Sequence, residues 1–209
     1  MTDQALIIGA DQKLHCYWCG HDEEYQRYHD EEWGWPVKDD QRLFEKICLE
    51  GFQSGLSWIT ILRKRENFRQ AFDGFDYKIV KHYDDQKVEE LLQNAGIIRH
   101  RGKIEAVINN ANCMEELLKE FPSFANYIWS YEPDETNRPQ KFDYETLSQI
   151  TQSEESIALS KDLKKRGWKF VGPTTCYAFM QSMGLVNDHF EGCFMRDVIE
   201  QKRKDFQRP

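Results

Sequence analysis

Apolar side chains recur every three to four residues along most of the chain, a spacing typical of helices that bury one face. One such run follows an acidic pair, because Leu43, Phe44 and Ile47 come after Asp39 and Asp40. An aspartate before an apolar periodic run is a common helix N-cap, so either acid could begin this helix. Strictly alternating apolar and polar positions, which predict strands, are almost absent. The pattern therefore predicts an all-α fold.

The other predicted elements follow from the same spacing and from glycine and proline positions. The segment GFQSGLSW interrupts the helical pattern, with Gly51 and Gly55 as helix-breaking positions. The polar stretch 132–148 contains two prolines and is the best candidate for a loop. Further helices are predicted within residues 58–68, 88–92, 104–117, 123–131, 157–166 and 174–183.

Composition limits the class of protein. A chain of 209 residues suits one domain or two tightly joined lobes, and 40% hydrophobic content argues against disorder. No apolar run approaches the roughly 20 residues of a membrane span. Residues 1–12 lack the basic flank and long apolar stretch of a signal peptide. We therefore expect a cytoplasmic protein that does not bind membranes.

The charge distribution permits DNA binding without requiring it. The formal net charge of −8 disfavours nucleic acid when taken over the whole chain, because phosphate binding depends on Lys and Arg. Basic residues nevertheless cluster within 63–69, 99–103 and 161–169. Such clusters could form one DNA-binding face, although charge runs are usually solvated helix faces.

A short connection, 167–173, joins the last two predicted helices and ends in a proline that suits the first position of a helix. Free backbone N–H groups at such a helix start, near Thr174, could bind a phosphate oxygen, and Lys169 would add attraction. On pattern alone, an ordinary helical hairpin that packs Phe170 and Val171 into the core is the more common structure.

This hairpin and the segment after it resemble the signature of the helix-hairpin-helix DNA glycosylases. In that superfamily a Val-Gly turn is followed by a helix and then by a Val-Asp segment with the catalytic aspartate. Val171 and Gly172 match the turn, whereas Val186 is followed by Asn187 in place of that aspartate. Thr174 stands where the lyase branch has its lysine. The resemblance therefore implies a monofunctional glycosylase without lyase activity.

Longer motifs resemble one branch, the 3-methyladenine DNA glycosylase I family. They are separated along the chain and lie at 28–34 (YHDEEWG), 49–58 (LEGFQSGLSW), 95–104 (AGIIRHRGKI) and 170–189. The resemblance extends from about Cys19 to Cys193. It implies hydrolysis of the N-glycosidic bond of 3-methyladenine in double-stranded alkylated DNA, with release of free 3-methyladenine. We expect a monomer with three regions: an N-terminal extension (1–15), a helical glycosylase domain (16–195) with its hairpin at 162–184, and a basic C-terminal tail (196–209).

Cysteine and histidine pairs near both ends of this match suggest a metal site. Two thiolates and two imidazoles suit tetrahedral Zn²⁺, and four filled ligand positions would make the ion structural. From the residues alone they could equally be buried thiols and hydrogen-bonded histidines, and Cys16 or His21 could replace the first ligand. The family resemblance implies one zinc ion at the matching positions Cys19, His29, His189 and Cys193.

A glycosylase must extrude its target nucleotide and bind the base in a pocket, where aromatic rings stack on it. A cationic alkylated base favours such rings further through cation–π attraction. The resemblance implies that Tyr25, Tyr28 and Trp58 form this pocket and that Glu50 accepts hydrogen bonds from the adenine edge. Glu50 is also the candidate catalytic residue. Core aromatics and a solvated helix end are the structural alternatives.

The same resemblance implies two DNA-contacting segments. Gln53, Gly55 and Leu56 would fill the gap that the flipped nucleotide leaves, as apolar wedges do in other DNA-binding proteins. The hairpin would bind the DNA backbone through Lys169, Val171, Gly172 and Thr174.

Two other functions compete with this hypothesis. The first is a helix-hairpin-helix glycosylase for a different lesion, although the sequence lacks the closely spaced cysteines of an iron–sulfur version. The second is a non-catalytic, zinc-stabilised helical module that binds DNA or protein. Release of free base from methylated DNA separates them, because a binding module releases none.

Overall fold

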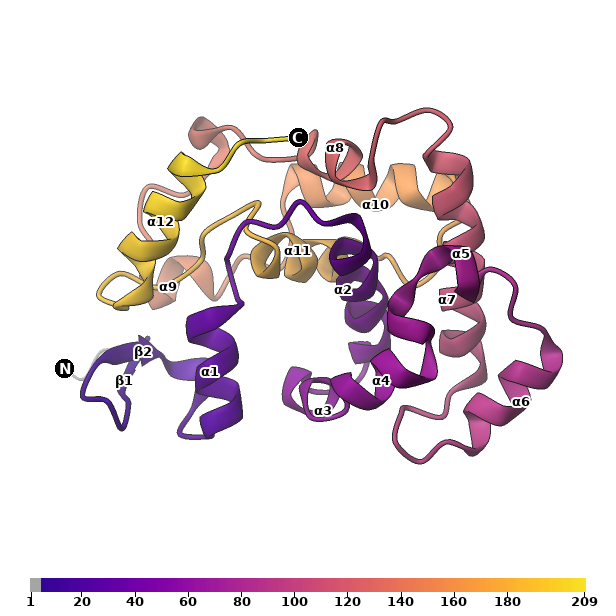
Figure 1. Cartoon of the computed structure of the whole chain (residues 1–209). Coiled ribbons are helices and arrows are strands. Elements are labelled where there is room, and N and C mark those ends of the chain that lie inside the picture. The colour runs from indigo at the N-terminus through magenta and orange to yellow at the C-terminus, as the bar shows by residue number, and fades with distance from the viewer. Residues whose placement is uncertain (1–4) are drawn as a thin grey trace.

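Helices make up most of residues 5–209, the part of the chain that the computed structural model describes (Figure 1). The all-α prediction is therefore confirmed for most of the chain. One strand pair at the N-terminus and three short 3-10 turns (Tyr17–Cys19, Asp73–Phe75 and Glu135–Asn137) accompany the helices. The elements are β1 (Leu6–Ile8), β2 (Leu14–Cys16), α1 (Glu23–Glu31), α2 (Asp40–Gln53), α3 (Trp58–Leu62), α4 (Arg65–Ala71), α5 (Tyr77–Val80), α6 (Asp85–Gln93), α7 (Arg101–Leu117), α8 (Phe124–Trp129), α9 (Tyr144–Leu147), α10 (Glu154–Lys165), α11 (Pro173–Ser182) and α12 (Met195–Asp205).

Helix α2 begins where the sequence predicts and ends later than predicted. The side chain of Asp39 caps the helix by accepting a hydrogen bond from the backbone N–H of Arg42 at 2.8 Å. The expected break at Gly51 is wrong, because the helix continues to Gln53. A Cβ atom at Gly51 would lie 3.1 Å from the Cβ of Phe170. This glycine therefore permits close packing against the hairpin instead of ending the helix.

Secondary structure lies within both of the predicted terminal segments. Residues 5–15 of the predicted extension belong to an antiparallel hairpin, and residues 1–4 lie outside the described part. The strands have three residues each, too few to show alternation. The predicted basic tail forms α12, where Arg203 donates a hydrogen bond to the carbonyl of Gly184 at 3.0 Å. The predicted loop 132–148 contains α9.

Helix α11 lies near the middle of the fold and packs against α2 and α10 (Figure 1). The β1–β2 hairpin, α1 and α12 lie on one side of it, and α3 to α7 lie on the other. The main core contains fully buried rings from several helices, including Phe44, Phe68, Phe124 and Phe179. A smaller apolar cluster joins the two ends of the chain and contains Ala5, Cys16, Leu147, Phe190, Cys193, Met195 and Ile199.

The segment after α1 is fixed against the end of α11 by direct backbone contact. Gly184 has a φ of +79°, and a Cβ atom there would lie 2.5 Å from the backbone nitrogen of Pro36. The N–H of Gly34 donates to the carbonyl of Ser182 at 3.3 Å, and that of Val37 donates to Met183 at 3.2 Å. Only glycine combines this conformation with so close an approach.

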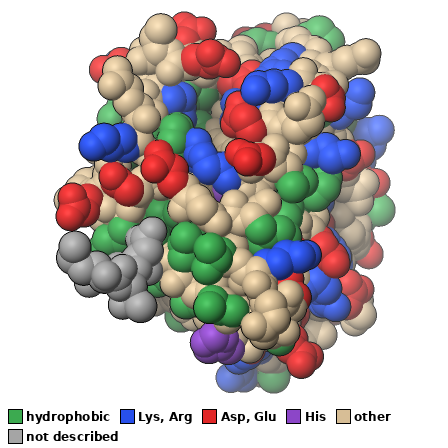
Figure 2. Space-filling view, turned by 90° about the vertical axis from the view of Figure 1, so that its left-hand side faces the viewer, with side chains coloured by type: hydrophobic (Ala, Val, Ile, Leu, Met, Phe, Trp, Pro, Cys, Tyr) green, Lys and Arg blue, Asp and Glu red, His purple; other side chains and the backbone are tan. Residues whose placement is uncertain are grey.

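The surface carries charges of both signs. On the face that Figure 2 shows, acidic and basic side chains are interspersed and form no continuous basic patch. In the described residues, every helix is too short or too polar to cross a membrane.

Candidate active site

A cavity of about 260 Å³ lies between α1, α2, the start of α3 and α11. All four residues predicted to bind the base line it: Tyr25, Tyr28, Glu50 and Trp58. The remaining lining residues are Tyr17, Trp18, Trp33, Gln53, Leu147, Ser148, Ala178, Gln181, Asp188 and Phe190. The structure thus brings the predicted pocket residues together and adds further aromatic rings to them.

The aromatic wall begins on α1, where Tyr25 and Tyr28 are three positions apart and therefore share a face of the helix. The ring centroid of Tyr28 lies 5.5 Å from that of Trp58, and the Tyr25 ring lies 5.1 Å from Trp18. Burial raises the pKa of Tyr25 to about 12, so its hydroxyl stays protonated at neutral pH. These rings offer flat apolar faces to a planar ligand and keep a hydroxyl donor beside it.

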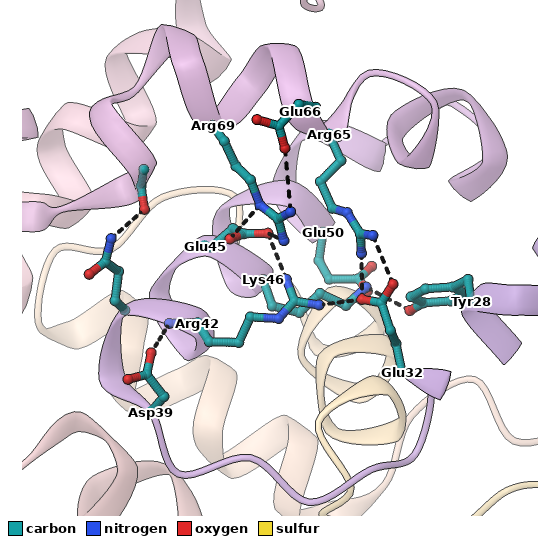
Figure 3. A network of polar contacts seen from close by, with 12 residues as sticks. Tyr28, Glu32, Asp39, Arg42, Glu45, Lys46, Glu50, Arg65, Glu66 and Arg69 are labelled. Atoms are coloured by element: carbon teal, nitrogen blue, oxygen red, sulfur yellow. Dashed lines mark hydrogen bonds and ion pairs between the residues drawn. The ribbon is translucent and has the colours of Figure 1, made fainter. Parts of the chain in front are cut away.

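A buried ion pair lies next to these aromatic rings (Figure 3). Lys46 precedes Glu50 by one turn of α2, and its Nζ lies 2.6 Å from Oε1 of that carboxylate. The side chains are 1% and 4% exposed, respectively. Lys46 also donates to the hydroxyl of Tyr28 at 3.0 Å. Glu50 is therefore a pocket group and not a solvated helix end.

A second buried carboxylate, Asp188, lines the cavity on the side of α11. It forms an ion pair with Arg138 and accepts hydrogen bonds from Tyr177 at 2.7 Å and Gln181 at 2.8 Å. The neighbouring Asn187 is not among the lining residues. Its amide oxygen lies 3.0 Å from Nδ1 of His189, and its amide nitrogen donates to the carbonyl of Arg196 at 3.0 Å.

The predicted wedge residues line a second hollow, which adjoins the base cavity. This hollow of about 300 Å³ shares Glu50, Gln53 and Ala178 with the cavity. Gly55, with a φ of +78°, turns the chain after α2, and the half-exposed Leu56 follows it. The opposite wall is the start of α11, with Thr174 and Thr175. The predicted wedge residues and the start of α11 therefore line the same hollow, which adjoins the base cavity.

The hairpin combines features of both predicted alternatives. Val171 is buried, and its carbonyl accepts a hydrogen bond from Ser160 at 2.6 Å, so its side chain belongs to the core. Phe170 has a φ of +57° and remains 37% exposed. Lys169 and Thr174 are exposed, and Gly172 precedes α11 as its N-cap. The exposed residues and the start of α11 can reach a ligand, whereas the Val171 side chain cannot.

Cysteine and histidine side chains gather where the β1–β2 hairpin meets the end of α1 and the segment before α12. His29 Nε2 lies 3.5 Å from Cys193 Sγ, and Cys16 completes a group whose ligand atoms all lie within 4.8 Å of one another. Cys19, the expected first ligand, lies in a second such group with His15 and His29. The geometry therefore favours Cys16, the alternative, because it shares a group with Cys193. His21 is exposed.

The two predicted histidine ligands have similar surroundings. In each of them, Nδ1 lies within hydrogen-bond distance of a side-chain oxygen. For His29 this is Oδ1 of Asp30 at 2.7 Å, and for His189 it is Oδ1 of Asn187 at 3.0 Å. Among the described residues, Nε2 of His189 is buried without a hydrogen-bond partner. The ring centroids lie 4.9 Å apart. His189 belongs to neither of the two groups above, but its unpartnered nitrogen fits a metal ligand, because ligating histidines usually hold a carboxylate or carbonyl on the other ring nitrogen.

Comparison with known proteins identifies the family. The model of the methyladenine glycosylase family matches residues 18–196. The chain belongs to the methyladenine glycosylase family. It is 52% identical to DNA-3-methyladenine glycosylase 1 of Escherichia coli and 50% identical to DNA-3-methyladenine glycosylase of Haemophilus influenzae. Each match spans 179 residues, which is 85% of this chain and 94% or 95% of the relative.

Solved structures of this family have the same fold. A variant of 3-methyladenine DNA glycosylase I in complex with 3-methyladenine superposes with a TM-score of 0.81 at 34% identity. The match covers 87% of this chain and 97% of that protein. The fold expected from the hairpin and the longer motifs is therefore confirmed, and the methyladenine glycosylase fold positions the pocket described above.

Sequence reasoning missed several residues of this pocket. Trp18 and Trp33 line the cavity, yet single tryptophans in a sequence are more often core residues. Asp188 gave no signal beyond its position next to Asn187. Lys46 could have been noticed, because an i, i+4 pair with Glu50 inside an apolar run is unusual for a solvated helix face.

Proposed function

We propose that this protein is a monofunctional DNA glycosylase that hydrolyses the N-glycosidic bond of 3-methyladenine in double-stranded alkylated DNA. The observation that carries the proposal is the buried Glu50 carboxylate in an aromatic cavity, next to a hollow that leads to the hairpin. Membership of the methyladenine glycosylase family supports the reaction, and the relative that binds 3-methyladenine supports the choice of base.

The pocket suits an alkylated adenine in shape and charge. The rings of Tyr25, Tyr28 and Trp58 can stack on a flipped base, and their faces attract the positive charge that methylation at N3 creates. Within the described residues, Oε2 of Glu50 accepts no hydrogen bond, so it can accept one from the base. Discrimination against normal bases would arise from this fit.

The chemistry requires little acid–base help from the protein. A cationic base is already a good leaving group, so its bond to C1′ breaks as a water oxygen bonds to that carbon. The base departs neutral, and the proton of the water passes to solvent. Asn187 lies outside the cavity lining and holds His189, so we assign it no acid–base role. Thr174 has no amine, which removes the lyase route.

DNA would approach along the hollow that links the wedge to the hairpin. Leu56 and Gln53 lie at its edge and can fill the space that the flipped nucleotide vacates. The start of α11 offers the backbone N–H groups of Thr174 and Thr175 to a phosphate, and Lys169 adds a positive charge nearby. Base recognition and backbone binding would thus occur on one face.

We also propose a structural zinc ion, held by Cys16, His29, His189 and Cys193. The support is the group of Cys16, His29 and Cys193 and the orphan Nε2 of His189. Thiolate and imidazole ligands suit zinc, and with four protein ligands the ion would tie the two ends of the chain together without taking part in hydrolysis. We further propose a monomer in the cytoplasm, where the six free cysteines would stay reduced.

Base release from methylated DNA tests this function. Purified protein is incubated with alkylated duplex DNA, and the released bases are separated and identified by chromatography. We expect free 3-methyladenine and an intact DNA backbone, since no lyase step follows. Release of a different base would indicate a glycosylase for another lesion. Tight DNA binding without any released base would indicate a non-catalytic module.

Substitution of Glu50 by Gln tests the assigned role of the carboxylate. Glu50→Gln keeps the shape but removes the charge, and a charged hydrogen bond contributes about 1.5–3 kcal/mol. We expect excision of 3-methyladenine and affinity for the free base to fall by about 10- to 100-fold. Glu45→Gln, which alters a buried carboxylate of α2 outside the cavity, is the matched control and should keep both. Full activity of Glu50→Gln would contradict the proposal.

A further inference from the structure

Lys46 is a fully buried cation whose contacts all belong to the base pocket. An ammonium has three N–H donors. Here Nζ lies 2.6 Å from Glu50 Oε1 and 3.0 Å from the Tyr28 hydroxyl (Figure 3). It also lies 3.2 Å from the centroid of the Trp58 ring. Lys46 itself does not line the cavity. It therefore lies directly behind three of the residues that would touch the base.

The remaining charges near this pair have other partners. Glu32 forms ion pairs with Arg42 and Arg65, and Glu45 forms ion pairs with Arg42 and Arg69 (Figure 3). In the described part of the chain, Glu50 is the only carboxylate within ion-pair distance of Lys46. The two side chains depend on each other for charge compensation.

Because both side chains are buried, each charge needs the other: Lys46 is compensated by Glu50, and Glu50 by Lys46. Desolvation lowers the pKa of Lys46 to about 8, although the charge of Glu50 opposes the shift. The Glu50 carboxylate is as deeply buried as Lys46, and removal of one member of a buried ion pair leaves the other charge uncompensated. The other charged or titratable groups of the described residues that face the pair or the cavity are Tyr17, Tyr25 and Tyr28, Glu32 after α1, Arg42 of α2, Arg65 of α4 and the Arg138–Asp188 pair.

We propose that Lys46 is a positioning residue of the base pocket: its ammonium is the counter-ion that compensates the charge of Glu50 and holds that carboxylate in place for recognition of the base. The same ammonium covers one face of Trp58, so a base must stack on the other face. Binding of the base thus depends on a residue that never touches it. This inference rests on the proposed role of Glu50 as the acceptor for the base.

The test replaces Lys46 by Met, which keeps an unbranched apolar stem and removes the charge. Affinity for free 3-methyladenine is measured by isothermal titration calorimetry for both proteins between about pH 6 and pH 9, a range that spans the pKa of Lys46. We expect Lys46→Met to bind at least about tenfold more weakly at the lower end. The ratio of the two affinities should approach one as the pH rises above the pKa of Lys46, about 8, because the wild-type side chain then also lacks its charge. Any titration of the base itself cancels in this ratio.

Two further variants distinguish the possible failures. In a Glu50→Gln background, Lys46→Met should cause little additional loss of affinity, because the charge it compensates is gone. Arg69→Met removes the ion pair between Arg69 of α4 and Glu45 of α2, which lies outside the cavity. This variant should leave the pH profile of base affinity unchanged. Two results would overturn the inference for Lys46 alone. In the first, Lys46→Met loses the same affinity for the base at every pH. In the second, its loss of affinity adds fully to the loss caused by Glu50→Gln. Unchanged binding by Glu50→Gln would overturn the proposed function as well.

Discussion

At the residue scale, Cys16 and Cys19 have different surroundings, and this difference predicts which of them would bind the proposed zinc ion. Cys16 shares a group of ligand atoms with Cys193, whereas the thiol of Cys19 donates to the carbonyl of Cys16 at 3.0 Å. We expect Cys16→Ser to lose most of the one zinc ion per chain and to melt at a lower temperature. Cys19→Ser should keep the ion, because a hydroxyl preserves that hydrogen bond. Elemental analysis measures the zinc content of both variants, and calorimetry measures their melting temperatures. Zinc loss only in Cys19→Ser would identify Cys19 as the ligand instead.

Residue types predicted the pocket only in part. Tyr25, Tyr28, Trp58 and Glu50 were expected from the motifs, and they line one cavity. Lys46 was not expected, because a lysine one turn from a glutamate is usually a solvated pair. Its burial depends on how α1 and α3 pack on α2, and such packing is not visible in the spacing of one helix.

At the element scale, the hairpin before α11 is the segment that would hold the DNA backbone. Lys169 is exposed, and its backbone is fixed by Asn110, which exchanges hydrogen bonds of 2.8 and 3.0 Å with it. We expect Lys169→Ala to weaken DNA binding about equally for all sequences and to reduce the salt slope by about one. The loss should be modest, because backbone N–H groups of α11 remain. Fluorescence anisotropy at several salt concentrations measures the slope, and a wild-type slope would show that this lysine is only solvated.

Element positions were predictable where caps and periodicity agree. Asp39 and Ser123 cap their helices as local chemistry predicts, and the hairpin helices begin within a few residues of their expected positions. Gly51 was misinterpreted, since its small size serves contact with a residue far away in sequence. The β1–β2 hairpin was missed because its strands have only three residues each, too few to show alternation.

At the scale of the whole molecule, helix α1 connects the cysteine–histidine cluster to the base pocket. Tyr28 and His29 are adjacent, and one lines the cavity while the other lies in the cluster. We therefore expect removal of zinc by a strong chelator to lower the melting temperature and also to weaken binding of free 3-methyladenine. Calorimetry before and after chelation, with zinc added back as a control, measures both. Unchanged base affinity in metal-free protein would show that the pocket is independent of the cluster.

The close backbone contact between Gly184 and Pro36 means that the hairpin and α11 cannot be separated from the rest of the fold without loss of contacts. A helix-hairpin-helix is often regarded as a portable unit that can be cut out and fused to another scaffold. Here the end of that unit is buried against backbone from the other end of the chain, with hydrogen bonds from Gly34 and Val37. An excised hairpin would expose those carbonyls and the apolar surface around them. Transplanting DNA affinity from this protein would therefore require the segment after α1 to be carried along with the hairpin.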